Sequence, residues 1–481
     1  MRERKLAIAV GIALFAPAAT VVAQTPELDQ IRQEIRSLKD SYESRIRALE
    51  ARLKAAETAA GQAEATAAKA ETAARAAAET NAAARDAAAV PGGAGQPAQN
   101  AFNPAISLIL QGSWGRYGHD PSSRITGFAA SGGEVSPPRG ASLGESELVI
   151  SGNIDPYFRG MLLAALTPEN EVAVEEGYVE TTALGQGFTA RGGRFFSGVG
   201  YQNSLHPHAW DFADPALAQR AFLGANYGDD GLQLRWVAPL PVFVEVGAEI
   251  GRGREFAGAG DVSRTPQRNG QDSQGFFVHV GGDIGDSHSY QLGASHLRQR
   301  SGAQGVALFD YDDLSGVANL FAGRQRIDGL ELVYKWAPDG NPRYRNVKFV
   351  AEWFQRRLDG DFTFNTAGAA TLAPLSARQS GWYAQAVYQF HPYWRVGARL
   401  DQLSHGSVNL DANAASITPP GFDPKRLSAM IDFNPSEYSR IRLQFSRDRS
   451  RLDAATGEAL SDNQVFLQYI HSLGAHGAHR F

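Results

Sequence analysis

Residues 203–217 read NSLHPHAWDFADPAL and bring together side chains that could bind a metal ion. His206 and His208 stand two positions apart, and Asp211 follows three positions later. Imidazole and carboxylate groups are protein ligands of zinc, and two histidines with this spacing can converge in an extended segment. His206, His208 and Asp211 are therefore the candidate zinc ligands, and no other cofactor is indicated. The alternative is a loop held by ordinary aromatic packing. Catalysis is not indicated, because no nucleophile stands beside a placed base.

The first residues of the chain have the pattern of a secretory signal peptide. Basic residues near the start precede an apolar run, Leu6–Phe15, and small residues lead to a cleavage site after Ala23. This order predicts a signal peptide over residues 1–23 and export from the cytoplasm.

The composition narrows the class of protein. The chain has no cysteine, so disulfides and a lipoprotein anchor are excluded. Its net charge of −5 gives no support for a nucleic-acid partner. Abundant glycine and aromatic residues without a long apolar run are typical of a transmembrane β-barrel.

Two segments separate the signal peptide from the rest of the chain. Residues 24–58 carry apolar side chains at alternating steps of three and four, with charged residues between them, which predicts a periplasmic coiled-coil helix. Residues 59–100 are alanine-rich and end in a Pro/Gly linker, so they are interpreted as a spacer. The seam of the coiled coil consists of Leu28, Ile31, Ile35, Leu38, Tyr42, Ile46, Leu49 and Leu53.

From residue 101 to residue 481 the apolar pattern has a period of two, as in LQLRWVA (232–238) and SRIRLQFSR (439–447). Alternation of apolar and charged residues indicates strands with one face of each kind. The expected strands cover 105–117, 143–153, 157–166, 171–182, 188–197, 231–238, 242–251, 275–285, 288–299, 326–337, 343–357, 381–390, 392–403, 425–433, 437–449 and 463–473.

Short turns and long glycine-rich connections alternate between these strands. That asymmetry and an even strand number are typical of outer-membrane barrels with both ends in the periplasm. The sequence therefore predicts an all-β transmembrane barrel of about 16 antiparallel strands, preceded by the coiled coil.

The charged faces of the strands cannot form a dry core, because unpaired buried charges are costly. They are expected to surround a polar lumen, and about sixteen strands leave room for an aqueous channel. The expected pore-lining residues are Arg235, Glu245, Glu249, Glu331, Lys335, Glu352, Arg395, Arg399, Asp401, Arg440 and Arg442.

Selectivity is predicted to be weak. The arginines of the C-terminal strands in this set favour anions, and its acidic members favour cations. The preferred interpretation is that these opposite charges pair with each other in the lumen. The loop that carries Asp310, Asp312 and Asp313 could attract cations, although acidic loops are usually only solvated.

On this map residues 198–230 form the third outer loop, which lies outside or folds back into the mouth of the pore. Compact apolar residues in it would suit a constriction against the inner wall. The expected constriction residues are His206, His208, Trp210, Asp211 and Phe212.

Three blocks carry a family resemblance: NPAISLILQG from Asn103, VEEGYVETTALGQGFTARGGRFFSGVGYQNSLHPHAWDF from Val174, and the ending NQVFLQYIHSLGAHGAHRF. They resemble bacterial outer-membrane porin-like proteins often labelled zinc-regulated TonB-dependent outer-membrane receptors, and more distantly the phosphate-selective porins. The resemblance implies an outer-membrane channel or receptor linked to zinc supply. The chain departs from a TonB-dependent receptor, which needs about 22 strands and a plug.

The C-terminal segment suggests two further roles. Phe481 is the terminal aromatic expected of barrels that the outer-membrane assembly machinery recognises. His471, His476 and His479 could form a periplasmic metal-binding tail, and the alternative is a solvated or strand-extending tail.

The expected function is a porin-type channel in the outer membrane of a Gram-negative bacterium, for passive uptake of small hydrophilic solutes or ions. One alternative is a metal or ligand receptor with little conductance, and a second is an envelope tether anchored by the barrel. An enzyme is not expected. The expected partners are outer-membrane lipid and two further copies of the chain in a homotrimer.

Overall fold

The computed structural model describes residues 104–474 except 122–123, 129–135, 168–170, 262–270, 302–305, 308–318, 367 and 454–455, together with Lys39 and Lys54. The chain divides into two compact units, Met1–Pro97 and Ala98–Phe481. Within the part that is described, no helix is long and apolar enough to cross a bilayer. The predicted signal peptide, coiled coil and spacer lie outside the described residues, as do Asp310, Asp312, Asp313, His476, His479 and Phe481.

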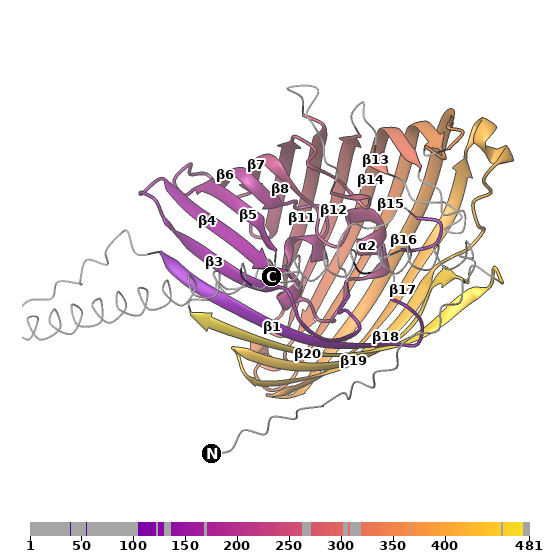
Figure 1. The fold of residues 1–481 in the computed structure, drawn as a ribbon. Coiled ribbons are helices and arrows are strands. Elements are labelled where there is room, and N and C mark those ends of the chain that lie inside the picture. The colour runs from indigo at the N-terminus through magenta and orange to yellow at the C-terminus, as the bar shows by residue number, and fades with distance from the viewer. Residues whose placement is uncertain are drawn as a thin grey trace, which may run out of the picture. The chain divides into compact units, whose positions relative to one another are not determined.

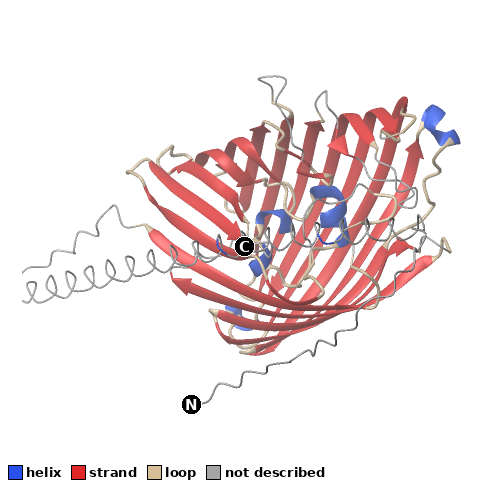
Figure 2. Cartoon of the chain, in the orientation of Figure 1, coloured by secondary structure: helices blue, strands red, loops and turns tan. Residues whose placement is uncertain are grey.

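Sixteen long antiparallel strands form a closed barrel (Figures 1 and 2). Each strand pairs with the next along the chain, and β20 pairs with β1 from Gly474 opposite Ser107 to Gln464 opposite Tyr117. The prediction of a barrel of about sixteen antiparallel strands is confirmed. The strands are β1 Ala105–Tyr117, β3 Ser146–Asn153, β4 Phe158–Leu166, β5 Val172–Thr181, β6 Phe188–Phe196, β7 Gly228–Val237, β8 Phe243–Gly251, β11 Ser273–Ile284, β12 His288–Arg300, β14 Leu320–Trp336, β15 Asn346–Phe364, β16 Thr371–His391, β17 Trp394–Asn409, β18 Lys425–Ser436, β19 Ser439–Leu452 and β20 Ala459–Gly474.

Short elements decorate the connections. One short strand pairs with β1 and another with β14, and two more pair with each other in the β8–β11 connection. These short elements are β2 Gly140–Leu143, β9 Glu255–Phe256, β10 Gly260–Asp261, β13 Val306–Ala307, η1 Gln202–Ser204, η2 Pro207–Ala209, α2 Leu217–Leu223, η3 Pro338–Gly340 and η4 Asp411–Ala415.

The outer face of the barrel carries a belt of exposed apolar side chains. Leu330, Leu400 and Leu443 are each about half exposed in the middle of their strands. Near the turns the belt becomes aromatic, with Trp394 and Tyr438 among the exposed residues. A closed sheet leaves no unpaired edge, and an apolar band bordered by aromatics is the surface that acyl chains require. The barrel is therefore a membrane protein.

The polarity of the strands reverses toward the long connections. On β14 the outward residues change from Leu330 to Asp328, Arg326 and Arg324, while the inward Phe321 becomes fully buried. The inward apolar residues of this part of the barrel, together with apolar residues of the connections, form a compact core beyond the belt. Its members are Phe256, Phe321, Leu358, Phe362, Leu375, Ala377, Leu410 and Ile417.

This reversal explains where the predicted strand boundaries are wrong. β16 begins at Thr371 instead of residue 381, and β15 ends at Phe364 instead of residue 357. The predicted ends stop where the outward apolar signal stops, at the edge of the membrane belt. Backbone pairing continues beyond it, for example from Ser376 opposite Asp359 to Thr371 opposite Phe364.

We expect a charge in the belt to destabilise the barrel and the same charge beyond it to have little effect. Leu443→Arg should lower the free energy of unfolding by about 2–4 kcal/mol, and Leu372→Arg, which lies beyond the belt on β16, by about 0–1 kcal/mol. Urea titration of barrels refolded in lipid vesicles measures both. Equal losses in the two variants would contradict the position of the belt.

Candidate functional site

Residues 197–227, here called the inner loop, connect β6 to β7 and fold into the barrel instead of away from it (Figure 1). The helix α2 lies against β15, β16 and β17, on the opposite wall from β6. Its buried Phe222 contacts the Phe354 ring at 6.3 Å between centroids, and every residue of α2 is buried. The loop predicted from the sequence to form a constriction thus lies inside the barrel.

A carboxylate on β15 anchors the first part of the inner loop. Glu352 accepts hydrogen bonds from the backbone N–H groups of Tyr201 (2.7 Å) and Gln202 (3.2 Å) and from the Tyr383 hydroxyl. Gly200 has a φ of +83°, and a Cβ there would come within 2.8 Å of the Glu352 carboxylate. Only glycine allows the backbone to turn this close to the wall.

Asp214 connects the middle of the inner loop to two arginines. Its carboxylate lies 2.8 Å from Arg399 Nη2 and 2.6 Å from Arg426 Nη1, and all three side chains are fully buried. Burial acts to raise the pKa of Asp214, but the charges of Arg426 and Arg399 outweigh it and lower this pKa below its usual value. In the same loop segment, the Leu217 N–H donates a hydrogen bond to Asp401 Oδ1 (2.8 Å).

Asp211 makes a second set of ion pairs. Lys348 Nζ lies 2.9 Å from its Oδ2 and Arg395 Nη1 lies 3.2 Å from its Oδ1. Burial would raise the pKa of Asp211, and the neighbouring Lys348 and Arg395 charges instead lower it strongly. Next to it, Arg442 donates to the carbonyl of Trp210 (2.7 Å).

The remaining residues predicted to line the pore lie on the inner face and are paired there. Arg235 contacts Glu180 (2.8 Å) and Glu245 (3.5 Å). Glu249 accepts from Ser197 Oγ and Gly198 N–H, and Glu331 lies 3.3 Å from His279. Arg440 donates to the carbonyls of His208 and Trp210, and Lys335 is partly buried.

Much of the charged face is therefore covered by the inner loop and does not line open water. The sequence pattern shows that these residues face inward, but it does not show the partners that neutralise them. Phe212 belongs to this covered region, where Arg399 lies 4.6 Å from the centre of its ring.

The two histidines contact glutamates that sequence reasoning did not select. His206 Nδ1 lies 3.2 Å from Glu175 Oε2, and its Nε2 lies 3.0 Å from Glu176 Oε2. His208 Nδ1 lies 2.8 Å from Glu147 Oε1. Burial opposes a charge on His206, but hydrogen bonds to Glu175 and Glu176 and the charge of Glu147 hold its pKa well above the usual value.

The predicted zinc ligands are not brought together as a set. Asp211 pairs with Lys348 and Arg395, whereas His206 and His208 pair with residues of β3 and β5. Among the described residues, the group of possible metal ligands that does converge is Glu147, Glu175 and His206.

A β-bulge explains why two consecutive glutamates can serve one histidine. In the β4–β5 pairing, Leu163 lies opposite Glu176 and Ala164 lies opposite Val174, so Glu175 is the extra residue. A bulge re-aims a side chain that strict alternation would send to the other face. The adjacent pair Glu175–Glu176 was the available signal in the sequence.

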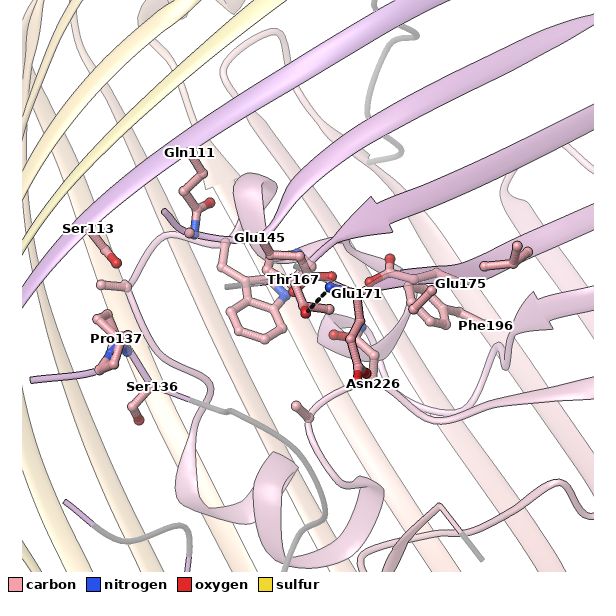
Figure 3. A pocket seen from close by; sticks show the side chains of 18 of the residues that line it. Gln111, Ser113, Ser136, Pro137, Glu145, Thr167, Glu171, Glu175, Phe196 and Asn226 are labelled. Carbon is pink, nitrogen blue, oxygen red and sulfur yellow. Dashed lines mark hydrogen bonds between the residues drawn. The ribbon is translucent and has the colours of Figure 1, made fainter. Parts of the chain in front are cut away.

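Two cavities lie on opposite sides of the inner loop. The first, about 430 Å³, opens toward the long connections and is lined by Glu145, Glu171 and Glu175 (Figure 3). The second, about 290 Å³, lies toward the short turns and is lined in part by Arg235 and Glu245. Phe196 lines both cavities, and its ring centre lies 4.8 Å from that of His206.

No family model matches the chain. An uncharacterized protein of Aquifex aeolicus (strain VF5) is 31% identical over 405 residues, which is 80% of this chain and 81% of that protein. The chain belongs to the family of this Aquifex protein.

Similar solved structures include the outer membrane channel DcaP of Acinetobacter baumannii, with a TM-score of 0.48 and 12% identity over 77% of this chain and 97% of that one. The loop L8 deletion mutant of OmpT of Vibrio cholerae has a TM-score of 0.47 and 10% identity over 77% and 99% of the two chains. The anion-selective porin of Comamonas acidovorans has a TM-score of 0.45 and 12% identity over 77% and 99%.

We expect Asp214 to be essential for holding the inner loop. Asp214→Ala removes one of the two carboxylates that buried Arg399 and Arg426 share, the other being Asp401, and should destabilise the barrel by about 3–5 kcal/mol. Asp230→Ala removes a partly exposed pair with Arg194 and should cost at most about 1 kcal/mol. Urea titration measures the free energy of unfolding of both variants. Hydrogen exchange should be faster in the inner loop of Asp214→Ala, which would show that the loop is the region that loosens. An inner loop that stays protected in Asp214→Ala would contradict this role.

Proposed function

We propose that this member of the family is a porin-type channel of the bacterial outer membrane, through which small hydrophilic solutes or ions diffuse passively. The observation that carries the proposal is the pair of cavities on the two sides of the inner loop, both of which are lined by Phe196. We propose that together they form a route through the barrel beside strands β1 to β14, with glutamates and arginines among the residues that line it. The other side is filled by the inner loop and its ion pairs.

The location in the outer membrane rests on three features. The signal peptide predicted over residues 1–23 implies export, the barrel is closed, and its outer face carries an apolar belt. The short turns then face the periplasm and the long connections face outward. The partners proposed from the sequence, the assembly machinery that would recognise Phe481 and two further copies of the chain, belong to this location.

The charges along the route favour cations at the outer entrance. The first cavity is lined by Glu145, Glu171, Glu175 and Glu255, against Arg254 as its basic residue among those described. Rings of acidic side chains concentrate cations. In the second cavity arginines and glutamates are paired with each other, so a modest overall preference for cations is proposed.

A link to zinc supply remains part of the proposal only through the resemblance of the sequence blocks. Zinc is one of the cations that such an entrance would attract. A receptor with little conductance is the competing function, because the inner loop fills a large part of the lumen.

We expect Phe196 to limit the passage. Phe196→Ala removes a ring that lines both cavities and should raise the single-channel conductance in KCl by about 1.5- to 2-fold. Phe445→Ala, on the outer face, is the matched control and should leave the conductance unchanged. Planar-bilayer recording measures both, and silence of the wild-type protein in every salt would favour the receptor.

The acidic entrance should set the ion preference. Glu171→Gln should lower the permeability ratio of K⁺ to Cl⁻ by about 2-fold, because Glu171 is an exposed charge in the first cavity. Glu437→Gln, in the turn between β18 and β19, should leave the ratio unchanged. Reversal potentials in asymmetric KCl report the ratio. A wild-type preference for anions would overturn the assignment.

A further inference from the structure

We infer that Glu147, Glu175 and His206 form a binding site for a first-row divalent cation of the Zn²⁺ type, which fastens the inner loop to β3 and β5. This site differs from the His206, His208 and Asp211 set expected from the sequence. Metal binding at this site does not require that the barrel conducts ions. The inference is therefore tested independently of the proposed function.

The distances between the ligand atoms suit a metal ion. His206 Nδ1 lies 3.2 Å from Glu175 Oε2 and 3.9 Å from Glu147 Oε2, and one ligand atom of each residue lies within 4.8 Å of the others. A zinc ion bound at about 2.0–2.2 Å holds neighbouring ligand atoms about 3–3.5 Å apart. A small contraction of the cluster would complete three ligands.

One ligand atom has no other role among the described residues. Glu147 Oε2 is buried and accepts no hydrogen bond, while Glu147 Oε1 accepts one from His208. The Glu147 side chain is 1% exposed. A buried carboxylate oxygen without a partner is costly, and Oε2 is directed toward His206 Nδ1 at a distance too long for a hydrogen bond. A cation between the two would satisfy it.

The surroundings supply the outer contacts that metal ligands need. His206 directs its second ring nitrogen to Glu176 at 3.0 Å, and Glu176 in turn accepts from the Phe196 N–H. A histidine that binds a metal through one nitrogen usually donates its other N–H to a carboxylate, which fixes the tautomer and the ring. His208 orients Glu147 in the same way.

The site is accessible from the first cavity, which Glu175 lines together with Glu145 and Glu171. This acidic approach would concentrate cations, and the cavity has room for the water that completes a four-coordinate ion. The imidazole ligand favours zinc and its first-row neighbours over Ca²⁺ and Mg²⁺, which prefer oxygen ligands alone.

The test is calorimetric titration of the full-length mature protein in detergent, after treatment with EDTA, using ZnCl₂ and in a separate run CaCl₂. We expect saturable Zn²⁺ binding that Glu147→Gln weakens at least about 10-fold, and no comparable Ca²⁺ binding. Glu180→Gln, which removes a half-buried carboxylate from the same strand β5, is the matched control and should bind Zn²⁺ as the wild type does.

A second variant and a crystal structure distinguish the loss of a zinc ligand from misfolding of the Glu147→Gln variant. Glu175→Gln should weaken binding as Glu147→Gln does, and zinc-soaked crystals of the wild type should show an anomalous peak between His206 Nδ1 and Glu147 Oε2. Wild-type affinity in both variants would overturn the inference. So would zinc density only at exposed histidines such as His405, or tighter binding of Ca²⁺ than of Zn²⁺.

Discussion

The barrel requires partners for the charged side chains that the alternation of its strands places on the inner face. Membrane strands must present apolar residues outward, and alternation then sends arginines, aspartates and glutamates to the inner face. Asp214, held between Arg399 and Arg426 with all three side chains fully buried, shows how the chain solves this problem. The inner loop supplies the missing counter-charges and backbone groups, so the same contacts that neutralise the wall also fix the loop across the lumen.

The fold follows closely from the sequence because two constraints act along every strand. Lipid outside and polar groups inside impose a period of two, and segments such as 439–447 show it without interruption. All sixteen expected strands are present. The extensions of β15 and β16 were missed because both faces change character there, with Leu375 inward and Ser376 outward. A pattern based on outward apolar residues cannot detect a strand that has left the membrane.

The site was predicted only in part, and the reason is local backbone geometry. The histidines at 206 and 208 stood out as residue types with known chemistry. Their partners lie far away in the chain, at Glu147 on β3 and at Glu175–Glu176 on β5. Strict alternation places only one of two consecutive glutamates inside, and the bulge at Glu175 breaks that rule. Contacts of this kind depend on register between distant strands, which composition and spacing do not encode.

The extension of β14 beyond the apolar belt has a consequence for the electrical environment of the entrance. From Leu320 to Arg326 the strand continues for roughly 15 Å along the barrel axis, given a rise of about 3.3 Å per residue and a tilt near 40°. The potential of a charged bilayer surface decays over about 8 Å in physiological salt. On this side, ions approaching the rim would therefore meet a local concentration set by bulk solution and by the protein's own carboxylates, with little contribution from lipid headgroups.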